Sequence, residues 1–132
     1  MSIVLANGVF DLLHVGHLRY LTEARSMGRW LAVGVTRDKF VGKTGRPIIP
    51  EEERLEMVFA LECVSEAFLC DDSIEALEKI KPDIFVKGHD YVEKGLLKAE
   101  IEFCEEHGVK MKHTKPNPQT TSAIIERIKC LG

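Results

Sequence analysis

The sequence predicts one α/β domain, with a five-stranded parallel sheet that carries helices on both faces. Two observations predict it: five short apolar runs alternate with helix-like segments, and no repeat or linker interrupts residues 1–132. Strands buried on both faces are apolar throughout, and the crossovers between parallel strands are usually helices. The 45% hydrophobic and 30% charged residues exclude a disordered chain. The length favours a single domain.

Each element has its own local signal. We expect strands at Ile3–Ala6, Trp30–Val35, Val64–Leu69, Asp83–Val86 and Val109–His113. We expect helices at His17–Met27, Glu51–Leu61, Ser73–Ile80, Gly95–His107 and Thr121–Leu131, and a loop over residues 37–47. Pro50 and the three glutamates after it are typical of a helix start. Ser73 is the expected cap of the third helix, and Ile124, Ile125 and Ile128 are expected to face the core.

Charge and cysteine content narrow the classes of partner. The net charge of −3 argues against a nucleic-acid partner, because such proteins need excess cations. No uncharged apolar run reaches about 18 residues, so we expect no membrane partner. The first residues lack a signal peptide's basic segment. The four cysteines show no metal-binding spacing, which favours reduced thiols in a cytoplasmic protein.

The loop after the first strand is the first candidate for chemistry, because ligands bind beyond the carboxyl ends of the strands in Rossmann-like sheets. Residues 8–17 read GVFDLLHVGH. A helix N-terminus attracts anions, and His14 and His17 add hydrogen-bond donors for phosphate oxygens there. Gly16 allows close approach of a ligand. The alternatives are a metal pair or two incidental histidines.

Four segments together resemble the cytidylyltransferase-like nucleotidyltransferases, which carry an H-x-G-H motif. They are residues 8–17, the segment RPIIP at 46–50 with Glu53 and Arg54, the segment PDIFVKGHDY at 82–91, and TTSAII at 120–125. Their order and spacing cover almost the whole chain. One position departs from the pattern: many relatives have Arg at the start of the late motif, where this chain has Lys115, which lacks the two-pronged guanidinium.

The resemblance implies transfer of a nucleotidyl group from a nucleoside triphosphate to a phosphorylated acceptor, with release of pyrophosphate. It implies catalytic roles for His14, His17, Lys43 and Arg54. It implies nucleotide contacts by Gly8, Val9, Phe10, Asp11, Gly16, Lys87, Gly88, Asp90, Thr120, Thr121 and Ser122. Mg²⁺ is the expected cofactor, and Asp11 is the candidate for its ligand on the protein.

Several of these residues also have a structural explanation. Arg54 could pair with Glu51, which lies three residues earlier on the expected helix. Lys43 lies in a glycine-flanked loop and could simply be solvated. Asp11 could cap a helix or stabilise a turn instead of contacting a ligand, and Thr120–Ser122 could only cap the last helix.

Two branches of the family compete for the substrates. Residues 86–91, Arg46-Pro47 and TTSAII are closest to the branch that makes ADP-heptose from heptose 1-phosphate and ATP. The alternative branch joins CTP to glycerol 3-phosphate or a related alcohol phosphate. A third alternative is a module that binds nucleotide without turnover. Relatives are commonly dimers, so a homodimer is expected. A single small core does not need all of its apolar residues here, and the surplus ones are Phe59, Leu61 and Phe68.

Overall fold

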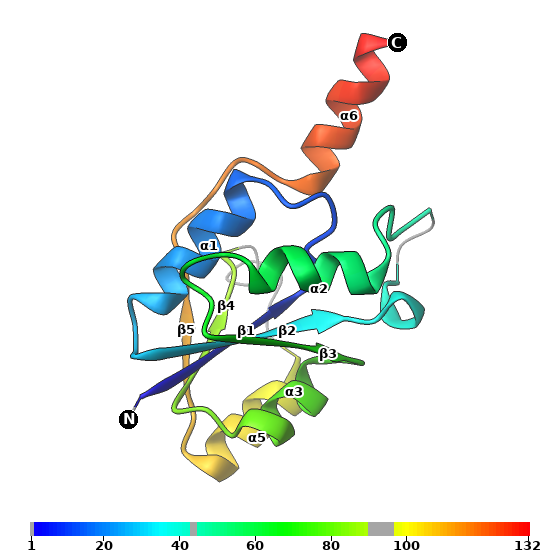
Figure 1. Cartoon of the computed structure of the whole chain (residues 1–132). Coiled ribbons are helices and arrows are strands. Elements are labelled where there is room, and N and C mark those ends of the chain that lie inside the picture. Colours follow the sequence, from blue (N-terminus) through cyan, green and yellow to red (C-terminus); the bar gives the residue numbers. More distant parts are fainter. Residues whose placement is uncertain (1, 43–44, 90–96) are drawn as a thin grey trace.

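The computed structural model describes residues 2–42, 45–89 and 97–132 (Figure 1). Its strands are all parallel and lie in the order β3-β2-β1-β4-β5. Their bounds are Ile3–Gly8 for β1, Trp30–Thr36 for β2, Glu66–Cys70 for β3, Ile84–Lys87 for β4 and Lys110–His113 for β5. The chain builds outward from β1 in both directions, so the topological switch point lies between β1 and β4.

Helices cover both faces of this sheet, as the sequence predicts. α1 (Val15–Arg25) and α2 (Glu51–Phe59) lie on one face, and α3 (Ser73–Ile80) and α5 (Lys98–His107) lie on the other (Figure 1). Neighbouring residues of β1 point to opposite faces: Val4 belongs to the core with Leu21, whereas Leu5 belongs to the core with Leu77. The predicted Rossmann-like α/β class is confirmed.

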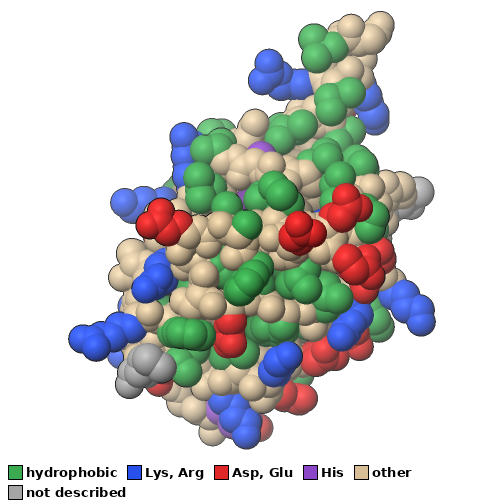
Figure 2. Space-filling view, in the orientation of Figure 1, with side chains coloured by type: hydrophobic (Ala, Val, Ile, Leu, Met, Phe, Trp, Pro, Cys, Tyr) green, Lys and Arg blue, Asp and Glu red, His purple; other side chains and the backbone are tan. Residues whose placement is uncertain are grey.

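The helix α6 (Thr121–Leu131) extends away from the rest of the domain (Figure 1). None of its residues is buried. Ile124 and Ile125 are half-buried, and Ile128 is 59% exposed, so the expectation that these three face the core is wrong. Figure 2 shows hydrophobic side chains along this helix and on the face that carries α1 and α2. An apolar stripe shows that a helix has a face to cover, but it does not show what covers it.

Smaller differences concern helix starts and the loop over 37–47. α1 begins at Val15, two residues before the expected start, because His14 is its N-cap. Asp72 caps α3 in place of Ser73, since its carboxylate accepts the backbone N–H of Glu75 at 2.9 Å. A 3₁₀ turn, η1, forms at Asp38–Phe40.

Three further predictions concern the start of the fourth helix, the apolar residues not needed by the core, and membrane-spanning helices. The expected start of the fourth helix at Gly95 lies outside the described residues, and α5 is described from Lys98. Phe68 is buried and Leu61 packs against the core, so only Phe59, at 60% exposure, is surplus to one core. In the part of the chain described, no helix is long and apolar enough to span a bilayer.

Candidate active site

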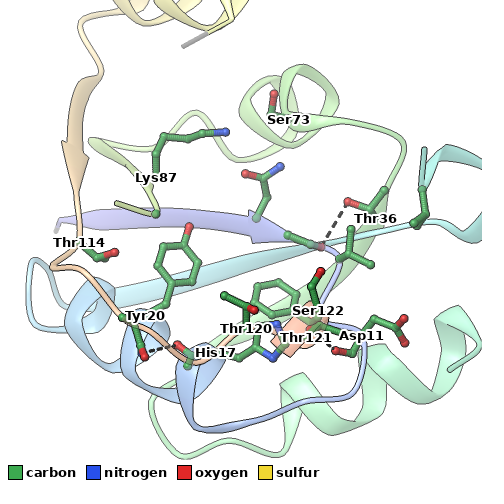
Figure 3. Close-up of a pocket in the computed structure, with 18 of the residues that line it drawn as sticks. Asp11, His17, Tyr20, Thr36, Ser73, Lys87, Thr114, Thr120, Thr121 and Ser122 are labelled. Carbon is green, nitrogen blue, oxygen red and sulfur yellow. Dashed lines mark hydrogen bonds between the residues drawn. The ribbon is translucent and has the colours of Figure 1, made fainter. Parts of the chain in front are cut away.

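A pocket of about 810 Å³ opens beyond the carboxyl ends of the strands. Most of the predicted site residues line it: Gly8, Val9, Phe10, Asp11, His14, Gly16, His17, Lys87, Gly88, Thr120, Thr121 and Ser122. Figure 3 shows the two sides of this space, with Lys87 and Ser73 on one side and His17, Thr120 and Thr121 on the other. Lys43 and Asp90 lie outside the described residues.

The β1–α1 loop is held in a strained shape by Asp11. Phe10 and Leu12, on either side of it, have positive φ angles of 56° and 51°, which cost energy for residues with a side chain. The buried carboxylate of Asp11 accepts the backbone N–H groups of Ile48 at 2.9 Å and Ile49 at 3.0 Å. Asp11 therefore has a structural role, but not the helix cap or turn considered for it: both carboxylate oxygens anchor the loop to residues 48–49, and His14 is the N-cap of α1.

His14 forms a hydrogen-bond network that defines its tautomer. Its Nδ1 accepts the N–H of Gly16 at 2.9 Å, and its Nε2 lies 3.3 Å from Oγ1 of Thr121. That hydroxyl lies 2.8 Å from the carbonyl oxygen of Asp11. A carbonyl only accepts, so the single hydroxyl proton goes to Asp11 and the oxygen accepts from His14. The network therefore assigns a neutral imidazole with its proton on Nε2. Burial lowers the pKa of His14 and favours the same neutral form.

His17 is neutral in the same way. Its Nδ1 accepts the backbone N–H of His14 at 3.2 Å, which leaves the proton on Nε2. The two imidazole rings are stacked with centroids 3.8 Å apart. Burial, followed by the neighbouring His14, lowers the pKa of His17 to about 4, although Asp11 opposes this shift. The start of α1 thus holds two imidazoles whose Nε2–H groups are neutral donors at pH 7.

Gly16 is required by the packing around it. A Cβ atom there would collide with the carbonyl oxygen of Gln119 and would lie 2.7 Å from Cε1 of His14. Asn117 Nδ2 also donates to the carbonyl oxygen of Gly16, at 3.4 Å. The absence of a side chain at Gly16 therefore lets the connection before α6 lie directly against the start of α1.

α6 also begins at the pocket. Thr120 is its N-cap, with Oγ1 accepting the N–H of Ala123 at 3.0 Å, so the capping role considered for this segment is present. Ser122 Oγ lies 3.4 Å from Nη2 of Arg46. Arg46 also lines the pocket, and its Nη1 lies 3.6 Å from the Asp11 carboxylate. Two helix N-termini at one pocket favour a bound anion there.

The structure does not bring Arg54 to the pocket. Its side chain is fully buried, and Nη1 donates to the carbonyl oxygen of Val9 at 2.7 Å. Nε donates to the carbonyl oxygen of Ile49 at 2.9 Å, and Nη2 pairs with Asp38 at 2.6 Å. The ion pair is thus with Asp38 rather than with Glu51. These contacts make Arg54 a residue that positions the β1–α1 loop, because its guanidinium is turned to carbonyls and a carboxylate instead of the pocket.

Sequence reasoning missed several residues of the lining. Glu100 of α5 is fully buried and pairs with Lys87 at 3.0 Å; an acidic residue in a helical pattern gave no signal of this. Tyr20 donates its hydroxyl to the carbonyl oxygen of Val86 at 2.7 Å and lines the pocket. Lys115, by contrast, is singled out in the sequence as the departure from the family pattern. It lines the pocket too, while its backbone N–H donates to the Glu23 carboxylate at 3.0 Å.

Comparisons with known proteins agree with this geometry. Residues 5–127 match the cytidylyltransferase-like family model. The chain is 39% identical to the bifunctional protein HldE of Citrifermentans bemidjiense over 96% of its own length, but it spans only 27% of that relative. It is 38% identical, over all of its length, to the FAD synthase of Ferroglobus placidus, of which it spans 91%.

Solved structures give the same result. The crystal structure of the lipopolysaccharide core biosynthesis protein from Thermoplasma volcanium is 34% identical, with a TM-score of 0.76, over 89% of this chain and 98% of that one. Pantothenate synthetase from Thermus thermophilus, 12% identical with a TM-score of 0.65 over 90% of this chain and 57% of that one, shares the fold. The chain belongs to the cytidylyltransferase-like family and is a nucleotidyltransferase.

Proposed function

We propose that this chain transfers the adenylyl group of ATP to a phosphorylated sugar, heptose 1-phosphate or a close analogue, and releases pyrophosphate. The observation that carries the proposal is the pair of Nε2–H donors on His14 and His17 at the start of α1. The hydroxyl groups and N-terminus of α6 lie beside them. A triphosphate bound between the starts of α1 and α6 meets N–H donors of both helices and of His17, and that of His14 when it displaces the Thr121 hydroxyl.

The reaction needs positioning and charge stabilisation more than covalent catalysis. An oxygen of the acceptor phosphate attacks the α-phosphorus, the bond from that phosphorus to the bridging oxygen of the β-phosphate breaks, and pyrophosphate leaves. Because both imidazoles are neutral, the Nε2–H of His17 stabilises growing negative charge without first exchanging a proton. The Nε2–H of His14 does the same once a phosphate oxygen replaces the Thr121 hydroxyl as its acceptor. Lys43 remains a predicted phosphate contact outside the described residues.

Mg²⁺ is proposed to accompany the triphosphate, whose charge it would offset. Among the described residues, no group of three or more His, Cys, Asp or Glu side chains could hold a metal ion. Both carboxylate oxygens of Asp11 already accept N–H groups. This donor set does not fit an ion held by the protein itself, so the phosphates would be its principal ligands, and no step is assigned to it.

The polar lining supports a sugar as the acceptor. Around the space beyond the histidines are the side chains of Asn7, Thr36, Ser73 and Thr114, and the pair of Lys87 and Glu100. Hydroxyl, amide and charged groups match the hydroxyl groups of a sugar. A second candidate acceptor is FMN, because the chain spans 91% of an FAD synthase. A flavin ring would use the apolar Phe40 and Val41, which also line the pocket.

The test is a pyrophosphate-release assay with a matrix of substrates. ATP, CTP, GTP and UTP are each combined with heptose 1-phosphate, FMN and glycerol 3-phosphate. We expect turnover with ATP and heptose 1-phosphate. Turnover only with ATP and FMN would replace the sugar by the flavin, and turnover only with CTP and glycerol 3-phosphate would replace both substrates. Nucleotide binding without turnover would favour a non-catalytic module.

We also propose a homodimer, because apolar surface remains uncovered on the single chain. Ile128 and Leu131 of α6 are 59% and 84% exposed, and Phe59 of α2 is 60% exposed. Light scattering after gel filtration should give twice the mass of the chain. The variant Ile128→Glu should shift that mass toward the monomer if α6 contributes to the interface; a wild-type monomer at high concentration would contradict the dimer.

A further inference from the structure

A buried ion pair forms one corner of the pocket. Lys87 ends β4 and Glu100 lies in α5, and their side chains meet with Nζ 3.0 Å from Oε2. Both residues are buried, Glu100 completely, and both line the pocket. The other carboxylate oxygen of Glu100, Oε1, is buried and has no hydrogen-bond partner. A polar atom in the pocket lining is therefore ready to accept a donor.

This arrangement differs from that of a buried carboxylate with a purely structural role. Asp11 is also buried, yet each of its oxygens accepts a backbone N–H. Leaving a buried acceptor without a donor costs stability, and such atoms are uncommon in native proteins. An anchor between α5 and the sheet would need only the contact of Oε2 with Lys87. The unpartnered Oε1 points instead to a donor that arrives with a ligand.

The neighbouring strand does not supply that donor. Lys87 and His113 are register partners at the ends of β4 and β5, so their side chains project to the same face of the sheet. Phe85 and Met111, two residues earlier on each strand, pack in the core covered by α3 and α5. His113 Nε2 is the other buried side-chain atom without a partner among the described residues. Glu100 Oε1 and His113 Nε2 thus do not satisfy each other, although Oε2 of Glu100 is paired with Lys87.

We propose that Glu100 is a specificity-determining residue whose Oε1 accepts a hydrogen bond from a hydroxyl group on a sugar ring of a bound substrate. The carboxylate would repel a phosphate oxygen, whereas a hydroxyl is a neutral donor. Lys87 keeps the carboxylate in place through Oε2. Two sugar rings could supply the hydroxyl, the ribose of the nucleotide and the ring of the acceptor. Only the acceptor alternative rests on the function proposed above.

The inference is tested by combining each protein variant with the normal and the deoxy form of each substrate, and asking whether the two changes have independent effects. The double variant Lys87→Met/Glu100→Leu replaces the pair with apolar side chains of similar size, a change that buried pairs often tolerate in stability. Glu100→Gln is the second variant, in case the first does not fold. The matched control is Lys98→Met/Glu102→Leu, which removes an exposed pair, 3.8 Å apart, on the same helix.

The nucleotide arm compares ATP with 2′-deoxy-ATP and 3′-deoxy-ATP, and the acceptor arm compares the sugar phosphate with its deoxy analogues. In wild type, loss of the recognised hydroxyl should lower kcat/KM about tenfold or more, because a buried charged acceptor is left unpaired. In the double variant, the hydroxyl and deoxy forms of that substrate should react equally well, and the control should behave as wild type. If the preference for the hydroxyl form over the deoxy form disappears in the nucleotide arm of the double variant, Glu100 binds the ribose. If it disappears in the acceptor arm, Glu100 binds the acceptor ring.

Equal deoxy penalties in wild type and in every folded Glu100 variant would overturn the inference and leave the pair as a structural anchor. The nucleotide arm is also read by thermal shift without an acceptor, so it does not depend on the sugar phosphate. If wild type fails to use any sugar phosphate, the proposed function fails, and the nucleotide arm alone decides on Glu100. No coupling in that arm would then overturn the inference as well.

Discussion

Thr121 and His14 meet across 107 residues of sequence, with Oγ1 of Thr121 3.3 Å from Nε2 of His14. The same hydroxyl donates to the carbonyl oxygen of Asp11 at 2.8 Å. One side chain at the start of α6 thus fixes both the β1–α1 loop and the tautomer of an imidazole at the phosphate site. The H-x-G-H motif and the late Ser/Thr-rich motif are therefore two parts of one hydrogen-bond network.

Thr121→Val removes this hydroxyl while keeping the shape of the side chain. We expect kcat/KM to fall about five- to tenfold: a hydrogen bond in such a network contributes about 1 kcal/mol, which is about fivefold, and His14 also loses its orientation. Thr121→Ser keeps the hydroxyl and should stay near wild type. Pyrophosphate release under identical conditions measures both, and equal rates for the Val and Ser variants would show that the network is not needed.

Replacing His17 by Gln or by Asn tests whether catalysis needs an N–H donor at the position of Nε2 or only an N–H donor at any position. The Gln side chain places its N–H₂ close to the position of Nε2, whereas the shorter Asn side chain places it nearer Nδ1. His17→Ala should lower kcat about 10²–10³-fold, the usual loss for one donor to a developing oxyanion. His17→Gln should keep part of that rate, and His17→Asn should not. A rate for Asn equal to or above that for Gln would contradict an Nε2 donor.

His17 also predicts a dependence of stability on pH. Its pKa of about 4 in the folded protein lies below the 6.5 of an ordinary histidine. Between these values the unfolded chain binds a proton that the folded chain does not, so the free energy of unfolding falls as the pH falls from 6.5 to 4. The slope from this group reaches about 1.4 kcal/mol per pH unit.

Denaturant titrations of wild type and His17→Gln at several pH values between 4.5 and 7.5 measure this contribution. All other titrating groups are shared, so the difference between the two curves isolates His17. We expect wild type to lose more stability than the variant below pH 6.5, and a constant difference above it. Two parallel curves throughout would show that the pKa of His17 is not lowered.

Gly16→Ala should damage nucleotide binding more than general stability. The added methyl group would displace either the backbone at Gln119 or the ring of His14. Gly28→Ala is the matched control, since its Cβ would lie 2.7 Å from Cγ2 of Val4, remote from the pocket. Both variants should unfold at lower temperature. Only Gly16→Ala should lose the thermal shift produced by nucleotide, and a similar loss for both would show that reduced stability is the cause.

Arg54→Met tests the positioning role of the buried guanidinium. The change leaves the carbonyl oxygens of Val9 and Ile49 without their donor and breaks the pair with Asp38. We expect unfolding to need about 3 kcal/mol less free energy, chiefly because two carbonyl oxygens lose their donor; the Asp38 carboxylate is 42% exposed and can be solvated. Arg37→Met, at an exposed pair with Asp71, should cost much less. Denaturant titration compares the two; wild-type stability in Arg54→Met would contradict the role.

The fold could be predicted from local patterns because the sheet is buried on both faces. Continuous apolar runs such as 31–35 occur where neither face meets water. The histidine loop could be predicted because its residues are consecutive in sequence and open a helix. The periodicity of α6 indicated an apolar stripe, yet Ile128 is exposed, since periodicity carries no information about which surface covers it.

The partners of Arg54 and Lys87 could not be predicted in this way. Asp38 lies in a 3₁₀ turn 16 residues before Arg54, and Glu100 lies on a helix 13 residues after Lys87. Each pair forms only when one element docks on another, so the periodicity of a single helix or strand cannot predict it. The same reasoning explains why Asp11 was open to several roles: the N–H groups that it binds belong to residues 37 and 38 positions later in the chain.

The distance along the chain between His14 and Thr121 has a consequence for the order in which the site is made. A ribosome synthesises the histidine loop first and all five strands before residue 114. All the strands thus precede the hydroxyl that orients the imidazole of His14. A chain cut before residue 120 would hold the scaffold without a finished phosphate site.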